Sequence, residues 1–437
     1  MTLPTIIEPR WLIPVEPAGI TLTDHAVVIR DEQIHAVMPI AEAWALHPEA
    51  SRVSLPTHAL IPGLVNLHTH AAMSLMRGIA DDLSLMDWLQ HHIWPAEARV
   101  ISDEFVYDGS LLACAEMLRG GTTCFNDMYF FPEAVARAAL RAGLRAAIGI
   151  IAVEFRTAYG NDAEDYLSKG MALRDRMRGE PLLSFCLAPH APFTVSDATF
   201  SRIVTYAGEL DLPVHIHLHE TAAEIQNSLN AHDMRPFERL QRLGLLGPGL
   251  IAVHAVHLEP DEIAALARHG SSVAHCPSSN LKLGSGIAPL AALLEAGVNV
   301  GLGTDGAASN NRLDLFTEMR LAALLAKGAT GSAQVMPAAR ALETATLGGA
   351  RALGLQDRIG SIRPGKLADL VAVNLDAPEL SPCYDPLSHL VYAAGREHVS
   401  DVWVHGERRV TAGRIDGIDI AALKQRAEHW RQRTGQA

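Results

Sequence analysis

Eight short apolar runs, separated by segments with a helical pattern, constrain the fold of this 437-residue chain more than any other feature. Short apolar runs are typical of buried strands, and strands that alternate with helices predict parallel strand–helix units. The predicted strands are Leu64–His70, Thr122–Asn126, Arg145–Ile150, Leu182–Ala188, Pro213–His219, Leu250–His254, Ser272–His275 and Asn299–Gly303. Eight such units predict an α/β fold, a (β/α)8 barrel of the TIM type. A doubly wound sheet is the alternative, but no Gly-x-Gly-x-x-Gly motif follows the first strand.

The two chain ends carry strand patterns of another kind. Near the N-terminus two short apolar runs flank an Asp31-Glu32 turn, as in a hairpin, and strand patterns return after Gly360. We therefore expect a small β-sandwich domain built from residues 1–58 and 361–437, beside a catalytic barrel of residues 59–360. Apolar residues at helical spacing also predict a terminal helix that docks on the molecule, namely Ile420, Leu423, Ala427 and Trp430.

Composition and charge narrow the class of protein. Hydrophobic residues make up 49% of the chain and charged residues 19%, which indicates a globular protein. The net charge of -13, without a basic run, argues against binding to nucleic acid or to an anionic membrane surface. No apolar stretch is long enough to span a bilayer, and the N-terminus has no signal-peptide pattern. Five scattered cysteines are typical of reduced thiols, so we expect a cytoplasmic protein.

His68 and His70 lie at the end of the first predicted barrel strand. Alternate side chains of a strand share a face, so the two imidazoles point the same way. Two imidazoles on one face can bind one metal ion, and imidazole suits zinc and iron. On this spacing alone, a metal pair and a pair of ordinary core or surface histidines are equally good interpretations.

More polar residues follow other predicted strands, at the end of the barrel where barrel enzymes keep their active sites. They are His215, His217, His219 and Glu220 on the fifth strand, His254 and His257 on the sixth, and Asp305 on the eighth. Geometry alone does not choose among the three histidines of the fifth strand. Each residue has an ordinary explanation, such as a core histidine, a turn residue or a helix cap. Their coincidence at one end of the barrel favours a metal site of three histidines and one aspartate, with a position left for water.

These motifs make the chain similar to the amidohydrolase superfamily, in its branch of adenosine-type and triazine-type aminohydrolases. The resemblance is carried by Pro62–His70, His217–Thr221, His254–His257, Thr304–Asn311 and Ile362–Leu370. Within that branch, the stretch His68–Asp82 together with Trp88 and Ile93–Glu97 resembles the group of 5-methylthioadenosine/S-adenosylhomocysteine deaminases.

The resemblance implies a role for each site residue. One divalent metal ion per chain, usually zinc with iron as the alternative, would be bound by His68, His70, His217 and Asp305. The catalytic residues would be Glu220 as proton shuttle, His254 beside the attacking water, and Asp305 as acceptor of that water's proton. Glu97 would bind the ribose hydroxyls, and His190 would contact substrate together with Glu220 and Asp305. Trp88 and Ser309 match pocket positions of the family, whereas Arg156 is a weaker match.

The implied activity is hydrolytic deamination at C6 of adenosine nucleosides that carry a 5′-thioether. The small-molecule nucleoside would be the substrate, and relatives of this kind commonly form homo-oligomers. Another aminohydrolase of the branch, acting on guanine, a pterin or a triazine, is the nearest alternative. An acidic residue placed for a ribose diol separates these possibilities, because those substrates lack ribose. A metal-binding scaffold without catalysis is the alternative from another class, although a purely structural zinc site needs neither Glu220 nor His254.

Overall fold

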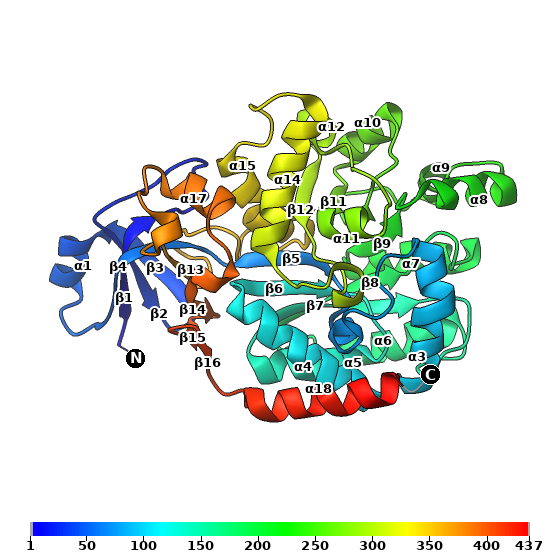
Figure 1. The fold of residues 1–437 in the computed structure, drawn as a ribbon, viewed down its shortest axis with the longest axis horizontal. Coiled ribbons are helices and arrows are strands. Elements are labelled where there is room, and N and C mark those ends of the chain that lie inside the picture. Colours follow the sequence, from blue (N-terminus) through cyan, green and yellow to red (C-terminus); the bar gives the residue numbers. More distant parts are fainter. Residues whose placement is uncertain (1–2, 436–437) are drawn as a thin grey trace.

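A barrel of parallel strands forms the larger part of the computed structural model, which describes residues 3–435 (Figure 1). Its eight strands pair in chain order, in the sequence β12-β11-β10-β9-β8-β7-β6-β5, and every pair is parallel. The strands are β5 (Leu64–Thr69), β6 (Thr122–Asp127), β7 (Arg145–Ala152), β8 (Leu183–Pro189), β9 (Val214–Leu218), β10 (Leu250–His254), β11 (Ser272–His275) and β12 (Asn299–Leu302). All eight predicted strands are present.

Hydrogen bonds between β5 and the loop after β12 help to close the barrel. The backbone N–H of Asp305 donates to the carbonyl of His68 at 3.0 Å. The side chain of Asn66 makes two further bonds: its oxygen accepts the backbone N–H of Thr304 at 2.9 Å, and its amide donates to the Thr304 hydroxyl at 2.7 Å. The barrel prediction is confirmed, and the closure brings the loop after β12 against the end of β5.

Helices cover the outside of the barrel (Figure 1). Their ends follow sequence signals: α5 begins at a proline, as expected for a first helical turn, and ends before Gly143, whose φ of +66° suits glycine. These helices include α4 (Asp103–Arg119), α5 (Pro132–Ala142), α6 (Ala163–Met177), α7 (Asp197–Leu210), α8 (Ala222–His232), α9 (Pro236–Arg242), α10 (Pro260–His269), α12 (Leu290–Glu295) and α14 (Leu315–Thr330). One face of each strand packs against the helices and the other faces the barrel interior, so the strands are buried almost throughout.

The two chain ends form a second sheet beside the barrel, to the left in Figure 1. Its strands run in the order β16-β15-β14-β13-β4-β1-β2-β3, so the predicted sandwich is hydrogen-bonded as one continuous sheet. They are β1 (Thr5–Leu12), β2 (His25–Arg30), β3 (Gln33–Pro39), β4 (Ser51–Pro62), β13 (Leu370–Asn374), β14 (Val399–Val404), β15 (Glu407–Thr411) and β16 (Arg414–Ile415). The chain passes from this sheet to the barrel at Gly63, and the predicted domain boundary at residues 58–59 falls within β4.

The terminal helix α18 (Ile420–Thr434) docks along α4, as predicted (Figure 1). Trp430 is 1% exposed, and its indole N–H donates to Asp108 at 2.9 Å. Ile420 differs from the prediction, because it lies in the first turn and is 39% exposed. The buried face of the helix therefore begins at Leu423.

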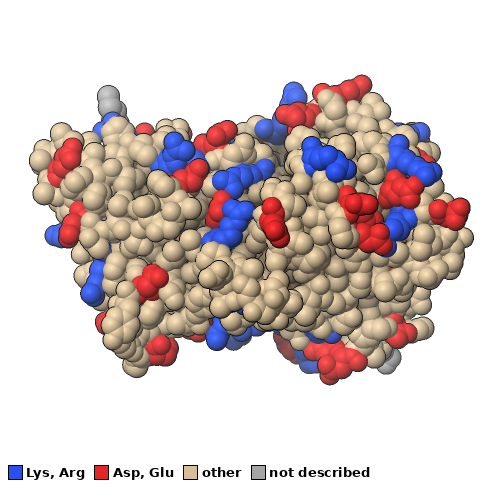
Figure 2. All heavy atoms as spheres, turned by 90° about the horizontal axis from the view of Figure 1, so that it is seen from above, with Lys and Arg blue, Asp and Glu red and all other residues tan. Residues whose placement is uncertain are grey.

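Charged side chains of both signs are interspersed over the face seen in Figure 2, in line with the absence of a basic run in the sequence. Across residues 3–435, none of the helices is both long and apolar enough to cross a bilayer.

Candidate active site

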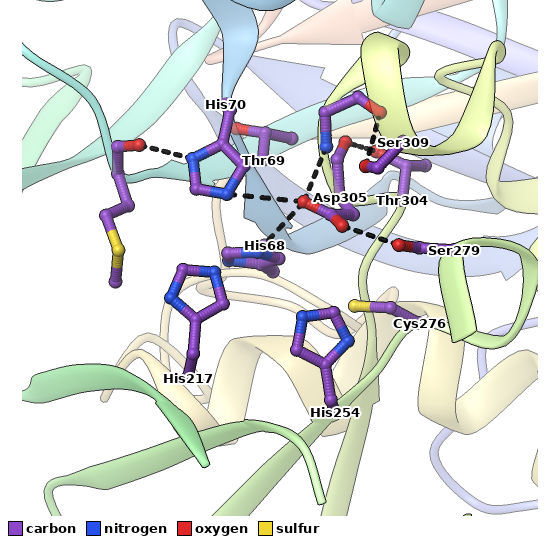
Figure 3. A network of polar contacts seen from close by, with 12 residues as sticks. His68, Thr69, His70, His217, His254, Cys276, Ser279, Thr304, Asp305 and Ser309 are labelled. Carbon is purple, nitrogen blue, oxygen red and sulfur yellow. Dashed lines mark hydrogen bonds and ion pairs between the residues drawn. The ribbon is translucent and has the colours of Figure 1, made fainter. Parts of the chain in front are cut away.

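The ends of four barrel strands bring the predicted metal-binding residues together with His254, which was predicted to lie beside the attacking water (Figure 3). His68 and His70 come from β5, His217 from β9, His254 from β10, and Asp305 from the loop after β12. Ligand atoms of His68, His70 and Asp305 lie within 4.8 Å of one another, and so do those of His68, His217 and His254. The cluster can hold a metal ion, and its geometry does not by itself separate His254 from the predicted ligands.

Backbone carbonyls fix the orientation of two of these rings. Nδ1 of His70 lies 2.5 Å from the carbonyl of Met128, and Nδ1 of His217 lies 2.6 Å from the carbonyl of His190. A carbonyl only accepts, so each ring carries its proton on Nδ1 and has a lone pair at Nε2. This arrangement is typical of histidines that bind a metal through Nε2.

His68 gives an independent test of the fit. Its Nδ1 lies 2.9 Å from Nε2 of His215, and its ring is fully buried. Among the described residues its Nε2 has no hydrogen-bond partner, although Asp305 Oδ1 lies 3.2 Å away. A buried nitrogen without a partner is costly, and a cation at this position would satisfy it. Three imidazoles and a carboxylate suit zinc and related divalent ions.

The three histidines of β9 have different environments. His215 lies behind His68, His217 lies in the cluster, and His219 leaves it. The strand ends at Leu218 and His219 has a φ of +54°, so the alternation that would place all three on one face stops before His219. Its Nε2 instead accepts the backbone N–H of Phe237 at 3.1 Å.

Asp305 is held by both of its carboxylate oxygens. Oδ2 accepts the hydroxyl of Ser279 at 2.7 Å, and Oδ1 accepts the backbone N–H of Gly306 at 2.7 Å. Its φ of +62° is uncommon for a residue other than glycine, and such conformations often occur at functional sites. Burial alone would raise the pKa of Asp305, but the facing imidazoles of His68 and His70 hold it well below its ordinary value.

Glu220 faces this cluster from the loop after β9. Burial raises its pKa and the charge of Asp305 adds to the effect, while His254 opposes it. His254 Nε2 lies 3.7 Å from Glu220 Oε2, and its Nδ1 lies 2.8 Å from Asn280 Oδ1. Glu224 accepts the backbone N–H groups of His219 and Glu220 at 3.2 and 2.8 Å, which fixes the turn that carries Glu220.

Glu97 lies on α3 (Trp94–Val100), in the segment that crosses from β5 to α4. The hydroxyl of Tyr129 donates to its Oε1 at 2.6 Å, and the Tyr129 ring lies 6.3 Å from the ring of His70. Burial raises the pKa of Glu97 to about 7, although the bond from Tyr129 and the charge of His70 act in the opposite direction. The Glu97 carboxylate therefore lies near the metal-binding cluster. Tyr129 bonds only its Oε1.

Of the remaining predicted residues, one lies beside the cluster, two are buried, and Arg156 is exposed. The His190 ring lies 4.9 Å from that of His217, and burial lowers its pKa to about 3. Ser309 is buried in α13 (Ala307–Asn310), and Trp88 is buried with its indole N–H bonded to the carbonyl of Ile79. Arg156 is exposed in the loop after β7, and within residues 3–435 no hydrogen bond or ion pair connects it to the cluster.

Sequence reasoning missed four residues that support the cluster, namely Tyr129, Glu224, Ser279 and Asn280. Two signals were present. Thr221 and Glu224 have the spacing of a capping box, and Ser279 and Asn280 follow β11 at the same end of the barrel. The contact of Tyr129 with Glu97 has no local signal, since 32 positions separate the two residues.

The model of the Amidohydrolase family matches residues 59–409 of the chain. The chain belongs to the amidohydrolase family. Among curated relatives of this amidohydrolase, a 5-methylthioadenosine/S-adenosylhomocysteine deaminase from Teredinibacter turnerae is 45% identical over 434 residues, which cover 99% of this chain and 98% of the relative. The family and the barrel fold predicted from the sequence are thus confirmed.

Two solved structures resemble this amidohydrolase over nearly its whole length. A crystal structure of an adenosine deaminase from Xanthomonas campestris with bound zinc is 50% identical, with a TM-score of 0.98 and 99% of each chain covered. An atrazine chlorohydrolase from Arthrobacter aurescens, complexed with zinc, is 24% identical with a TM-score of 0.90, over 98% of this chain and 100% of the other. The second likeness shows the fold alone.

Proposed function

We propose that this amidohydrolase deaminates adenosine nucleosides that carry a 5′-thioether. It would hydrolyse the C6 amino group of 5′-methylthioadenosine, S-adenosylhomocysteine or both, and release ammonia and the inosine analogue. One observation carries the proposal: the imidazoles and carboxylates His68, His70, His217, His254, Glu220 and Asp305 converge at one end of the barrel. The name of the relative at 45% identity supports this substrate class.

The metal site in this proposal consists of His68, His70, His217 and Asp305, with one divalent ion per chain. The unpartnered Nε2 of His68 and the zinc of the 50% identical structure support zinc as that ion. A bound divalent ion supplies Lewis-acid activation of a water molecule at neutral pH. His254 is assigned beside the water, because Asn280 already orients its ring toward Glu220.

The chain's own residues move the protons. Asp305 accepts a proton from the attacking water, and Glu220 delivers one to N1 of the adenine ring so that C6 can accept the oxygen. His254, when protonated, donates from Nε2 to the charge that develops on the oxygen. The C6–O bond forms, and the amino group takes up the proton that Asp305 accepted. The C6–N bond then breaks, ammonia leaves, and the remaining proton of the C6 hydroxyl returns to Glu220, so that the inosine carbonyl forms. The raised pKa of Glu220 supports its role as an acid.

Glu97 separates nucleosides from the other substrates of the branch. A carboxylate can accept two hydrogen bonds from a ribose diol, and guanine, pterins and triazines offer no such diol. The position of Glu97 beside Tyr129 and His70 supports a substrate that extends from the cluster to α3. His190, Trp88 and Ser309 would complete the pocket. Arg156 stays a weaker candidate because it is exposed.

Ammonia release across a panel of nucleosides tests the proposal. The panel compares 5′-methylthioadenosine, S-adenosylhomocysteine and adenosine, with guanine, a pterin and melamine as controls. The highest kcat/KM is expected for a thioether nucleoside. Turnover of a control alone would favour another aminohydrolase of the branch, and no turnover with or without added metal would favour a binding scaffold. Self-association of the chain stays a prediction, which light scattering would test.

Substitution of the metal-binding residues tests the site. Asp305→Asn and His217→Ala should each abolish turnover and lower the zinc content measured by atomic absorption, because a four-ligand site loses one ligand. Arg156→Ala is the matched control and should retain metal. Full activity with full metal content in both ligand variants would refute the assignment.

A further inference from the structure

Lys282 joins three loops at the end of the barrel that carries the cluster. It is the last residue of α11 (Pro277–Lys282), and its Nζ lies 2.7 Å from Asp81 Oδ1, 2.6 Å from Asn311 Oδ1 and 3.0 Å from the carbonyl of Ala308. Asn311 in turn donates to Asp81 Oδ2 at 2.8 Å. Lys282, Asp81 and Asn311 thus form a closed ring of side chains, here called the loop clasp.

The loop clasp connects the segments that carry the site. Asp81 lies between the short helix η1 (Ala71–Met76), which follows β5, and α2 (Leu85–Trp88), and the same segment continues to Glu97 on α3. Asn311 follows α13, the helix after Asp305. Lys282 ends the helix that supplies Ser279 and Asn280 to the cluster. Asp81 and Lys282 are 201 positions apart, so only the fold brings these loops together.

The backbone on both sides of Asp81 adopts left-handed conformations. Ala80 has a φ of +55° and Asp82 a φ of +65°, and Asn311 has a φ of +71°. Left-handed conformations are unfavourable for residues other than glycine, less so for Asp and Asn than for Ala, and they persist where surrounding contacts hold them. Arg77 adds to the restraint, because it donates to the carbonyl of Asn311 and pairs with Glu116.

Both charged side chains of the loop clasp reach solvent. The Lys282 side chain is 19% exposed and that of Asp81 is 35% exposed. The hydrogen bond from Lys282 lowers the pKa of Asp81, against the smaller effect of burial, and the bond from Asn311 lowers it further. A charge pair that reaches solvent weakens when salt screens it, so the strength of the clasp should depend on ionic strength.

We propose that Lys282 is a positioning residue for substrate binding: through Asp81 it holds the segment that carries Trp88 and Glu97 against the loop of Asp305. It does not touch substrate. The effect on nucleoside affinity rests on the proposed function, whereas the restraint on residues 77–84 does not. Loss of the clasp leaves the metal-binding residues in place and frees the segment that carries Glu97.

Two measurements on the metal-loaded protein test this. In Lys282→Met the KM for the nucleoside with the highest kcat/KM should rise about tenfold, while kcat should stay within about threefold of the wild-type value. The reason is that the variant loses the charged hydrogen bonds that hold the Glu97 segment in its substrate-binding position. Trypsin should cleave faster after Arg77, which mass spectrometry detects without any substrate. Lys282→Arg keeps the charge and should restore most of both properties. Lys169→Met is the matched control, because Lys169 also binds one carboxylate and one carbonyl but lies on α6.

A double-mutant cycle with Asp81→Asn decides whether the two residues act together. The double variant should be no worse than Lys282→Met alone, and added salt should raise the wild-type KM but not that of Lys282→Met. Additive effects, or a Lys282→Met protein with wild-type KM and wild-type cleavage, would overturn the proposal. Failure of the proposed function is distinct, because it appears as no nucleoside turnover by the wild type, and the cleavage measurement still tests the restraint.

Discussion

Glu220 has the environment that a general acid requires. It is buried beside the charge of Asp305, its pKa is raised, and His254 lies 3.7 Å away. Glu220→Gln cannot deliver a proton, so kcat should fall by roughly a hundredfold or more. Zinc content, measured in parallel, should stay normal because Glu220 is not assigned as a ligand. Near-wild-type turnover would contradict this role. Glu220 would then be a buried residue before α8, and another residue would have to donate the proton.

Glu97 and Tyr129 are expected to act as a pair on the ribose. Glu97→Ala should lower kcat/KM for nucleosides by at least about tenfold, since hydrogen bonds to a charged group contribute about 1.5–3 kcal/mol each. Tyr129→Phe should show the same pattern with a smaller loss, because it removes the 2.6 Å bond that orients the carboxylate. Steady-state kinetics on a ribonucleoside and its 2′,3′-dideoxy analogue measure both.

The dideoxy substrate is the control for this pair. Wild-type Glu97 has no diol to hold there, so the losses in both variants should shrink. Equal losses on the two substrates would refute the ribose role and favour the guanine or triazine alternatives. Metal content should be unchanged throughout, since neither residue is assigned to the metal.

At the scale of elements, sequence patterns within one segment predict the strands of the barrel, but they do not predict the side-chain contacts between segments. The eight strands were predictable because each is an apolar run bounded by turn signals, and α5 was predictable from Pro132 and Gly143. The clustering of His68, His217 and Asp305 followed from the rule that barrel strand ends meet. The rest depends on contacts between distant positions, such as His68 with His215, 147 positions apart. No pattern in one segment encodes such a partner.

Helix α14 provides a pH-dependent test of packing around the site. Glu318 is buried and accepts the backbone N–H of Ser278 at 3.0 Å and the amide of Asn310 at 2.8 Å, yet burial raises its pKa to about 7. The pKa of Glu318 is higher in the folded protein than its ordinary value of 4.5. The stability that protonated Glu318 contributes is therefore fully present below about pH 4.5, and it is lost as the pH rises through about 7. Glu318→Gln removes this titration but also changes the hydrogen bonds.

The pH dependence separates these two effects. At about pH 8 the wild type has lost the contribution of Glu318, whereas Glu318→Gln has no such loss. The Tm of the variant relative to the wild type should therefore be higher at about pH 8 than at about pH 5, and the corresponding change in the free energy of unfolding is up to ~3 kcal/mol. Calorimetry of the metal-loaded proteins measures it. The hydrogen-bond change shifts both values equally, so the same difference at both pH values would contradict the raised pKa.

At the scale of the whole molecule, a buried ion pair joins the barrel to the sheet of the chain ends. Arg145 begins β7 and Asp369 precedes β13, and their side chains are 4% and 1% exposed. The guanidinium donates twice to the carboxylate, at 2.9 and 3.1 Å, and once to the carbonyl of Pro181 at 3.0 Å. Asp369 also accepts the backbone N–H of His405 at 2.7 Å. The pair lies at the start of a barrel strand, whereas the cluster lies at the strand ends.

Breaking this pair should therefore destabilise the protein without changing its chemistry. Arg145→Met leaves the carboxylate of Asp369 buried and unpaired, which should cost about 3–5 kcal/mol in urea unfolding at neutral pH, and Asp369→Leu should cost a similar amount. The double variant should lose less than the sum, because it leaves no unpaired charge. Arg176→Met, which breaks an exposed pair with Glu133, should cost under about 1 kcal/mol. The folded fraction of each variant should keep wild-type kcat and zinc content. A loss of kcat in correctly folded Arg145→Met would show that the contact between barrel and sheet also sets the geometry of the site.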